Sequence, residues 1–173
     1  MRIIVMITLL LCANYISTAQ YDPGAINYGL TLAKIIGKEQ ELAIGGRIEY
    51  AFNCSTTFIG EYNRSFAIKV EKEYEGFNEF ALGVNLILFN WYPTTITAGM
   101  GYIGNDSNIF KSIEDEAFLG FRTGDFNHGA QIKIRALHQI ITPLHVYAEL
   151  NIKSLGRRYD TLLIGFNYDF EAR

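Results

Sequence analysis

Cysteine and proline are scarce in this chain, which has two cysteines and three prolines among 173 residues. Cys12 lies in an apolar N-terminal run, so Cys54 is the single cysteine of the remaining sequence and no internal disulfide is expected. Beyond that run, no segment holds the ~18 uninterrupted apolar residues that a membrane helix needs. If the mature protein spans a membrane, it must do so with strands.

The N-terminal segment has the pattern of a secretory signal peptide. Arg2 precedes the apolar run 3–13, and the small residues Ser17 and Ala19 follow it. We expect cleavage before Gln20, which separates a signal peptide, residues 1–19, from a single domain, residues 20–173. Cleavage removes the positive charge of Arg2 from a chain of net charge −3 and leaves −4. Basic residues are not in excess, so no nucleic-acid partner is expected.

Apolar residues alternate with polar or small ones in eight segments that turn-like breaks separate. In the last segment, every second residue from Leu162 to Phe170 is apolar or aromatic, whereas Thr161, Gly165 and Asn167 have the other parity. Because a strand turns successive side chains to opposite faces, such a segment has one continuous lipid-compatible face. The segments are residues 24–34, 41–52, 56–69, 79–90, 95–104, 129–139, 144–153 and 160–170. They predict an all-β fold, an eight-stranded antiparallel up-and-down transmembrane β-barrel.

The breaks between the segments are of two kinds. Three are short, at residues 53–55, 91–94 and 141–143, and we expect them to be periplasmic turns. The longer breaks, at 35–40, 70–78, 105–128 and 154–159, would then be external loops, with both chain ends in the periplasm. A further strand-like piece, 117–123, is predicted to extend a strand above the membrane within the third external loop.

Charged residues occur on the polar faces, near the middle of their segments: Arg47, Glu49, Glu61, Lys133, Arg135 and Glu149. A three-residue turn at 53–55 places Arg47 opposite Glu61, and one at 141–143 places Arg135 opposite Glu149. An eight-stranded barrel is just wide enough for side chains to fill it, so we predict a closed interior of paired charges. The alternative is that these charges relay protons or bind a solute. Inward glycines such as Gly83 and Gly165 either leave a pocket or ease the curvature of the wall.

The three histidines give no strong catalytic or metal pattern. His128 lies near Asp125, while His138 and His145 flank one turn in a register that points them to opposite faces. No metal or cofactor is therefore expected. A lipid-modifying enzyme, a lipid A acylase or deacylase working through His128 or His145, is the alternative. A soluble secreted barrel would need an apolar interior, which the charge pattern contradicts.

The hairpin at 141–143 and the ending Gly165-Phe166-Asn167-Tyr168-Asp169-Phe170 resemble the small outer-membrane barrels of the OmpA and OmpX type. This resemblance implies location in the outer membrane and contact with its lipid. It also implies that Gly165, Tyr168 and Phe170 form an insertion signal for the barrel-assembly machinery. Gly60-Glu61-Tyr62 and the strand 98–102 resemble the TraO family of conjugative-transposon outer-membrane proteins. That resemblance implies a conjugation-associated role as an alternative.

These patterns together predict an integral outer-membrane barrel without enzymatic activity, acting as a structural or interaction protein. Loops on a rigid scaffold usually carry the function of such a protein. The third external loop, residues 105–128, is the longest, and we expect it to contact a partner protein or a glycolipid.

Overall fold

The computed structural model describes residues 21–35, 42–66, 68–70, 73–107, 119–154 and 161–170. The predicted signal peptide, residues 1–19, lies outside these ranges, so its cleavage stays a prediction. No helix in the described ranges is long and apolar enough to cross a membrane.

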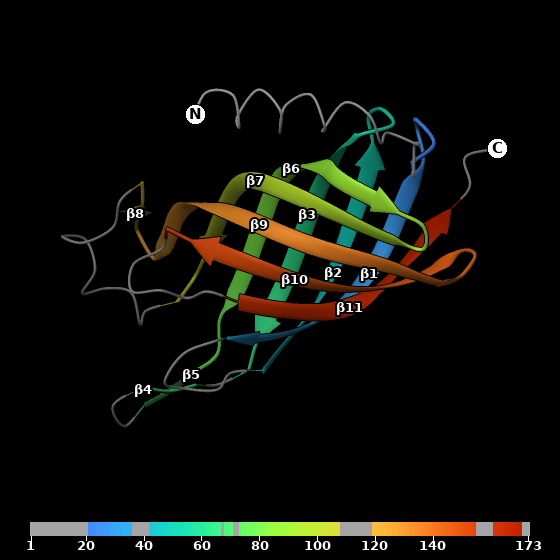
Figure 1. Ribbon diagram of the computed structural model, residues 1–173. Helices are drawn as coiled ribbons and strands as arrows, with labels where there is room; N and C mark the ends of the chain where they lie inside the picture. Colours follow the sequence, from blue (N-terminus) through green and yellow to red (C-terminus); the bar gives the residue numbers. More distant parts are fainter. Residues whose placement is uncertain are drawn as a thin grey trace, which may run out of the picture.

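Eight strands form a closed antiparallel barrel (Figure 1). Each strand pairs with the next wall strand along the chain, and β11 pairs with β1 to close the wall. The predicted fold class is confirmed. The wall strands are β1 (Ile26–Ile35), β2 (Leu42–Ala51), β3 (Thr56–Ser65), β6 (Asn78–Trp91), β7 (Thr94–Asn105), β9 (Phe126–Ile141), β10 (Leu144–Lys153) and β11 (Thr161–Phe170).

Three short strands lie outside the wall. β8 (Phe121–Thr123) pairs with the first residues of β9, as predicted for a strand extension, although 117–118 fall outside the described residues. The prediction of one strand over 56–69 is wrong. β3 ends at Ser65, and β4 (Ile68–Val70) pairs with β5 (Glu73–Glu75) in a separate sheet. Because β6 begins opposite Arg64, the chain beyond β3 has no wall strand on that side and pairs with itself instead.

The connections alternate between short and long. Residues 52–55, 92–93 and 142–143 make tight turns at one end of the barrel, where β1 begins and β11 ends. The longer connections leave the opposite end, from which β8 and the β4–β5 hairpin project (Figure 1). With the usual arrangement of outer-membrane barrels, the tight turns are periplasmic and the long connections external.

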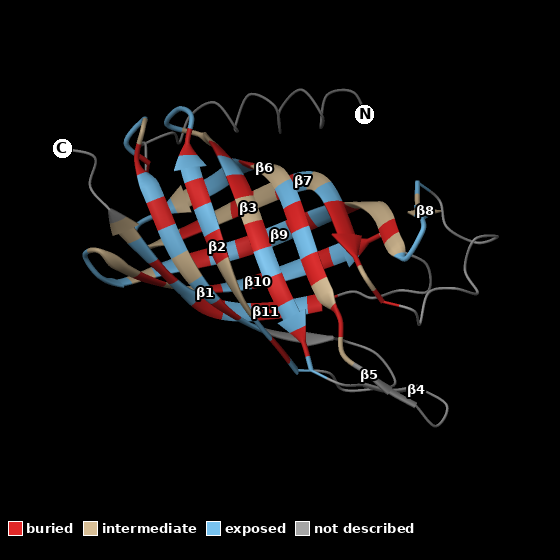
Figure 2. Cartoon of the chain, turned by 180° about the vertical axis from the view of Figure 1, so that it is seen from behind, coloured by how far each residue is buried: buried red, intermediate tan, exposed pale blue. Residues whose placement is uncertain are grey.

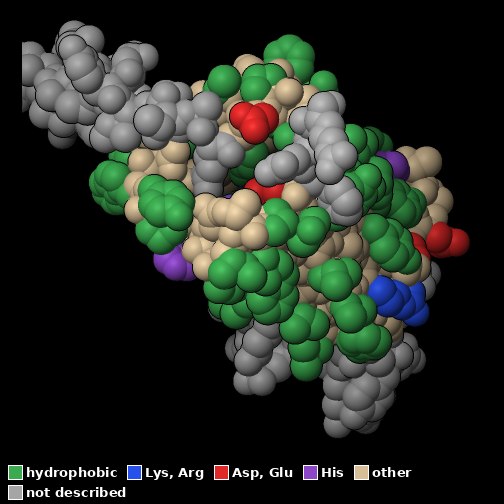
Figure 3. All heavy atoms as spheres, turned by 90° about the vertical axis from the view of Figure 1, so that its right-hand side faces the viewer, with side chains coloured by type: hydrophobic (Ala, Val, Ile, Leu, Met, Phe, Trp, Pro, Cys, Tyr) green, Lys and Arg blue, Asp and Glu red, His purple; other side chains and the backbone are tan. Residues whose placement is uncertain are grey.

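Buried and exposed residues alternate along each wall strand (Figure 2). The exposed positions are mostly large and apolar, such as Leu30 at 70 % exposure and Ile164 at 51 %, whereas most of the buried residues are polar or charged. Hydrophobic side chains cover much of the described surface that Figure 3 shows. An apolar outer wall around a polar interior is stable in a bilayer and not in water, so this is a transmembrane barrel.

Neighbouring atoms occupy the space beside the inward glycines Gly99 and Gly165, so these positions do not form a pocket. A Cβ atom at Gly165 would meet the backbone oxygen of Leu30 and would lie 2.6 Å from the hydroxyl of Tyr147. At Gly99 it would meet the amide oxygen of Asn85 and would lie 3.0 Å from Cγ of Lys133. Glycine at these positions therefore gives long polar side chains room to cross the interior.

Candidate functional site

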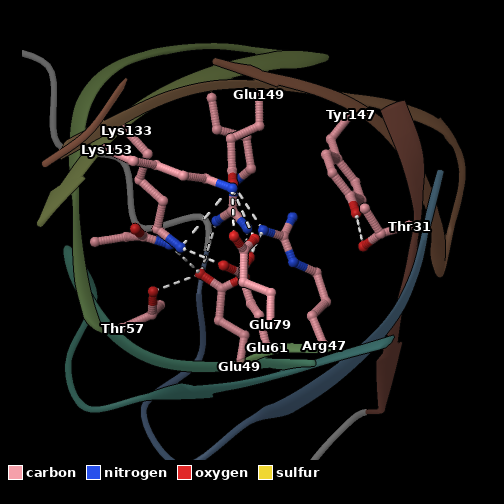
Figure 4. Close-up of polar contacts among 12 residues, drawn as sticks. Thr31, Arg47, Glu49, Thr57, Glu61, Glu79, Lys133, Tyr147, Glu149 and Lys153 are labelled. Carbon is pink, nitrogen blue, oxygen red and sulfur yellow. Dashed lines mark hydrogen bonds and ion pairs between the residues drawn. The ribbon is translucent and has the colours of Figure 1, made fainter. Parts of the chain in front are cut away.

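The six charged residues predicted to face inward all lie inside the barrel. Each is at most 4 % exposed, and the side chains of the five that Figure 4 labels converge from several strands. β2 contributes Arg47 and Glu49, β3 contributes Glu61, β9 contributes Lys133 and Arg135, and β10 contributes Glu149. We refer to these six residues as the central charge cluster.

Arg47 is the hub of one half of the cluster. Arg47 lies directly opposite Glu61 on the neighbouring strand and forms an ion pair with it. Nη2 of Arg47 also donates to Oε2 of Glu149 at 2.7 Å, across the barrel interior. Nζ of Lys133 donates to the second oxygen of Glu61 at 3.1 Å. The guanidinium of Arg47 lies 4.2 Å from the ring centroid of Tyr147, in cation–π contact.

Arg135 and Glu49 form the other half. Arg135 binds both oxygens of Glu49, with Nη1···Oε2 at 2.8 Å and Nη2···Oε1 at 2.7 Å. Arg135 is directly opposite Glu149 in the β9–β10 register, yet its Nε is 3.9 Å from Oε2 of that carboxylate. The predicted opposition of Arg135 and Glu149 is confirmed, but the shorter contacts of Arg135 are those to Glu49. A planar guanidinium binds best to two oxygens of one carboxylate, and Glu49 on the far wall offers them.

Neighbouring polar side chains complete the hydrogen bonding of Glu49. The hydroxyl of Thr57 donates to Oε1, and Nδ2 of Asn85 donates to the same oxygen at 3.3 Å. Tyr21, from the segment before β1, accepts from Nη2 of Arg135 at 3.4 Å. Each polar contact lowers the cost of burying these charges.

A second buried ion pair, between Lys153 and Glu79, lies nearer the external end. Nζ of Lys153 donates to both oxygens of Glu79, at 2.7 and 2.8 Å. This pair was not predicted from the sequence, although both residues have the inward parity of their strands. Glu79 is the first residue after a predicted loop, whereas the charged residues predicted to face inward were chosen near the middle of their segments. Together with the cluster, the pair brings the buried charges to four acids and four bases, balanced within the described interior.

The histidines lie apart from one another. His138 faces outward, 2.9 Å from the hydroxyl of Thr94, whereas His145 is buried. Nδ1 of His145 is 3.2 Å from Oδ2 of Asp169 without hydrogen-bond geometry, a proximity that was not predicted from the sequence. No group of three metal-ligating side chains occurs in the described part of the chain.

His128 belongs to an aromatic cluster at the external end of β7 and β9. Phe121 of β8 stacks on the His128 ring at 4.6 Å and 11°, and Phe126 meets its edge at 5.1 Å. The hydroxyl of Tyr102 is 2.8 Å from Nδ1 of His128. Phe126 also lies over Gly104, where a Cβ atom would come within 2.9 Å of its ring. We call Tyr102, Phe121, Phe126 and His128 the external aromatic cluster.

Asp125, which the sequence places near His128, is instead 3.5 Å from Arg122. The residues proposed as an insertion signal all lie on β11. Gly165 faces the interior and Tyr168 faces outward, while Phe170 is the last residue of the strand and its side chain is not described. Recognition of these residues by the barrel-assembly machinery stays a prediction.

The sequence matches no family model and no curated protein. Solved structures do match. The N-terminal barrel domain of OprF from Pseudomonas aeruginosa aligns with a TM-score of 0.59 at 11 % identity, covering 85 % of this chain and 98 % of that one. Ail of Yersinia pestis, in complex with the heparin analogue sucrose octasulfate, gives 0.54 at 13 % identity and covers 84 % and 97 %. The chain has the fold of the small outer-membrane barrels.

This small outer-membrane barrel also resembles a designed protein. A de novo transmembrane β-barrel aligns with a TM-score of 0.60 at 12 % identity, covering 87 % of this chain and 98 % of the design. The fold and the apolar outer wall together locate the protein in the outer membrane. The fold does not determine the function, because one fold supports many functions, so the function must be inferred from the side chains. A conjugation-associated role, implied by the resemblance to the TraO family, stays a prediction.

Proposed function

We propose that this protein is a non-enzymatic outer-membrane barrel that binds a partner at the external aromatic cluster. The observation that carries the proposal is the exposure of this cluster beyond the wall. Phe121 is 65 % exposed and the adjoining Leu119 is 66 % exposed. Exposed aromatic groups beside polar residues commonly mark interaction sites.

The filled interior supports a function outside the barrel. Four buried acids and four buried bases pair across it, and an eight-stranded barrel has little space beyond its side chains. Transport through the interior would require several of these ion pairs to separate. The central charge cluster is therefore best understood as a structural plug that stiffens the scaffold beneath the external loops.

The position of the cluster also supports binding. β9 is 16 residues long and β10 only 10, so the first residues of β9 extend beyond the end of β10. β8 pairs with these residues. Stacking on His128 holds Phe121 in place, which lowers the entropy that binding would cost. Ail, which shares the fold, has been crystallised with a heparin analogue, so a saccharide is a reasonable first ligand to test here.

The test is binding of the purified barrel in lipid nanodiscs to a glycan array and to immobilised extracellular proteins. Phe121→Ser should lower binding at least ten-fold, because it removes the ring that lies outermost in the cluster. Phe52→Ser is the matched control, since Phe52 is 60 % exposed in the turn at the opposite end. Equal loss in both variants, or no binding by the unaltered barrel, would refute the proposal.

The lipid-modifying alternative has a separate test. His128 contacts Tyr102 and two phenylalanine rings, and His145 lies near Asp169 and the backbone of Pro143, so no serine, threonine or cysteine partners either ring among these described contacts. Lipid A profiles of cells carrying His128→Ala or His145→Ala should match those of the unaltered strain. A lost lipid product would replace the binding proposal with an enzymatic one.

A further inference from the structure

The outer wall is hollowed by a groove that crosses β11, β1, β2 and β3. Gly46 and Gly60 form its floor, and Leu30, Tyr62 and Phe166 stand along its sides. Its volume is about 770 Å³. A second hollow of about 630 Å³ shares Gly60 and continues toward β6 and β7. The groove crosses the strands obliquely, from Leu144 at the start of β10 to Phe80 near the external end of β6.

The packing of the barrel does not require glycine at either floor position. A Cβ atom at Gly60 would meet nothing nearer than Cδ2 of Leu82, at 3.6 Å. At Gly46 the nearest atom would be the backbone oxygen of Gly29, at 3.8 Å. Glycine within a strand weakens it and often marks close approach by another molecule. These two residues therefore open space on the lipid side of the wall, unlike the inward glycines.

Beyond the external end of the groove, the next outward side chain on β3 is that of Arg64. β3 points Gly60, Tyr62 and Arg64 to the same outer face, with Arg64 nearest the external end. Arg64 is exposed, and the other outward positions of β3 are uncharged. Its Nη1 donates to Oδ1 of Asn78 at 2.9 Å, and the hydroxyl of Tyr62 donates to the same oxygen at 2.7 Å.

Asn78 links Tyr62 and Arg64 to Asp106 in the third external connection. Its backbone nitrogen and its Nδ2 donate to the two carboxylate oxygens of Asp106, each at 2.6 Å. Asp106 is thereby engaged by Asn78, and no carboxylate forms an ion pair with Arg64 in the described part of the chain. Arg64 is exposed and lies one residue before the external end of β3.

We propose that the groove and Arg64 form a binding site for one phosphorylated lipid A molecule of the outer leaflet. The phosphate would contact Arg64, whose planar guanidinium suits two phosphate oxygens. An acyl chain would lie over Gly60 and Gly46. Arg64 is four residues from Gly60, or about 13 Å along the strand, which separates a headgroup from the hydrocarbon region in the expected direction.

Charge favours this occupant over a second barrel. A second copy would have to bring an anionic group against Arg64, and the described outward face of the wall carries none. An anionic lipid has the headgroup that Arg64 requires and the apolar chain that the groove fits. This site lies on β11, β1, β2 and β3, whereas the external aromatic cluster lies on β7, β8 and β9, and the site does not depend on the function proposed for that cluster.

The experiment uses the exported protein, extracted from the outer membrane in mild detergent and examined by native mass spectrometry. Bisphosphorylated, hexa-acylated lipid A is added in increasing amounts, and phosphatidylglycerol is added in a parallel series. Arg64→Gln should weaken lipid A binding at least five-fold, while glutamine can still donate to Asn78. Gly60→Leu should do the same by filling the groove. Ala136→Leu is the matched control, because Ala136 is exposed on β9 and lines neither hollow.

The unaltered protein and the control should retain one lipid A, and both site variants should lose it while keeping a heat-dependent gel shift. If Gly60→Leu fails to fold, Gly46→Leu fills the same groove with as little internal contact. Equal lipid A binding by all variants would mean that the lipid is held nonspecifically and would refute the site. Phosphatidylglycerol binding as tight as lipid A would refute the proposed ligand. A dimer that Gly60→Leu abolishes would assign the groove to a second copy instead.

Discussion

Removing one member of the Arg135–Glu49 pair should destabilise the barrel far more than removing both. Glu49→Leu leaves the guanidinium of Arg135, which is 1 % exposed, with Glu149 as its nearest carboxylate at 3.9 Å from Nε. Arg135→Met leaves Glu49 buried with only neutral donors apart from more distant charges. Breaking a buried ion pair in this way costs about 3–5 kcal/mol, so each single variant should lose that much unfolding free energy.

The double variant Glu49→Leu/Arg135→Met restores the charge balance. Two cations, Arg47 and Lys133, then remain with two carboxylates, Glu61 and Glu149, in the central cluster. Apolar replacement of a whole buried pair is often close to neutral. Thr57 and Asn85 lose their acceptor, at about 1 kcal/mol each. The double variant should therefore lie within about 2 kcal/mol of the unaltered protein, with a coupling energy of about 4 kcal/mol or more between the two sites.

Urea unfolding in lipid vesicles, followed by tryptophan fluorescence, measures these differences. Trp91 is the single tryptophan and lies exposed at the periplasmic end of β6, so its emission reports transfer from bilayer to water. A double variant as unstable as the worse single variant would refute the reasoning. So would two single variants that lose less than about 1 kcal/mol each, because that result would mean the charges remain hydrated.

Three further changes test other parts of the structure in the same unfolding assay. Ile164→Arg places a charge on the lipid-facing side of β11 and should cost about 2–4 kcal/mol; no loss would reverse the assignment of inside and outside. Gly165→Ala should cost about 1–3 kcal/mol, because its Cβ atom would overlap the backbone of Leu30, whereas Gly60→Ala is the matched control with room for a methyl group. Lys153→Met should cost about 1–3 kcal/mol by leaving Glu79 unpaired, and adding Glu79→Leu should recover most of that loss.

The alternating pattern predicted the wall strands well wherever both faces of a strand were uniform. The segment 144–153 has the bounds of β10, and 160–170 differs from β11 by one residue. The pattern was less accurate for β9, which was predicted over 129–139 and is observed over Phe126–Ile141. The external residues of β9 pair with β8 and lie beyond the lipid, so Asn127 and His128 need not follow the apolar alternation. In β6, a register shift between Ile87 and Phe89 follows an apolar run with no alternation to fix the register.

The ion pairing inside the barrel could be predicted only in part, because register fixes neighbours along the wall and not across the interior. Turn length placed Arg47 opposite Glu61 and Arg135 opposite Glu149, and the structure has both arrangements. Arginine side chains are long enough to reach the far wall, so Arg135 binds Glu49 on β2. Gly29 and Gly99 likewise leave room for the side chains of Arg47 and Lys133. A pattern along one strand does not contain this information.

The balance of buried charge limits where a ligand can act on this protein. A solute bound inside would have to displace one member of a pair such as Arg135–Glu49, and the charge left unpaired would cost about 3–5 kcal/mol. Binding at the outer surface carries no such penalty, because Arg64 and Phe121 are already exposed. The two surfaces lie on different strands and share no contact residue, so their effects should be separable. Phe121→Ser should leave lipid A retention unchanged, and Arg64→Gln should leave binding at the external aromatic cluster unchanged. If either change alters both, the two surfaces are coupled through the third external connection, which Asp106 joins to Asn78 beside Arg64.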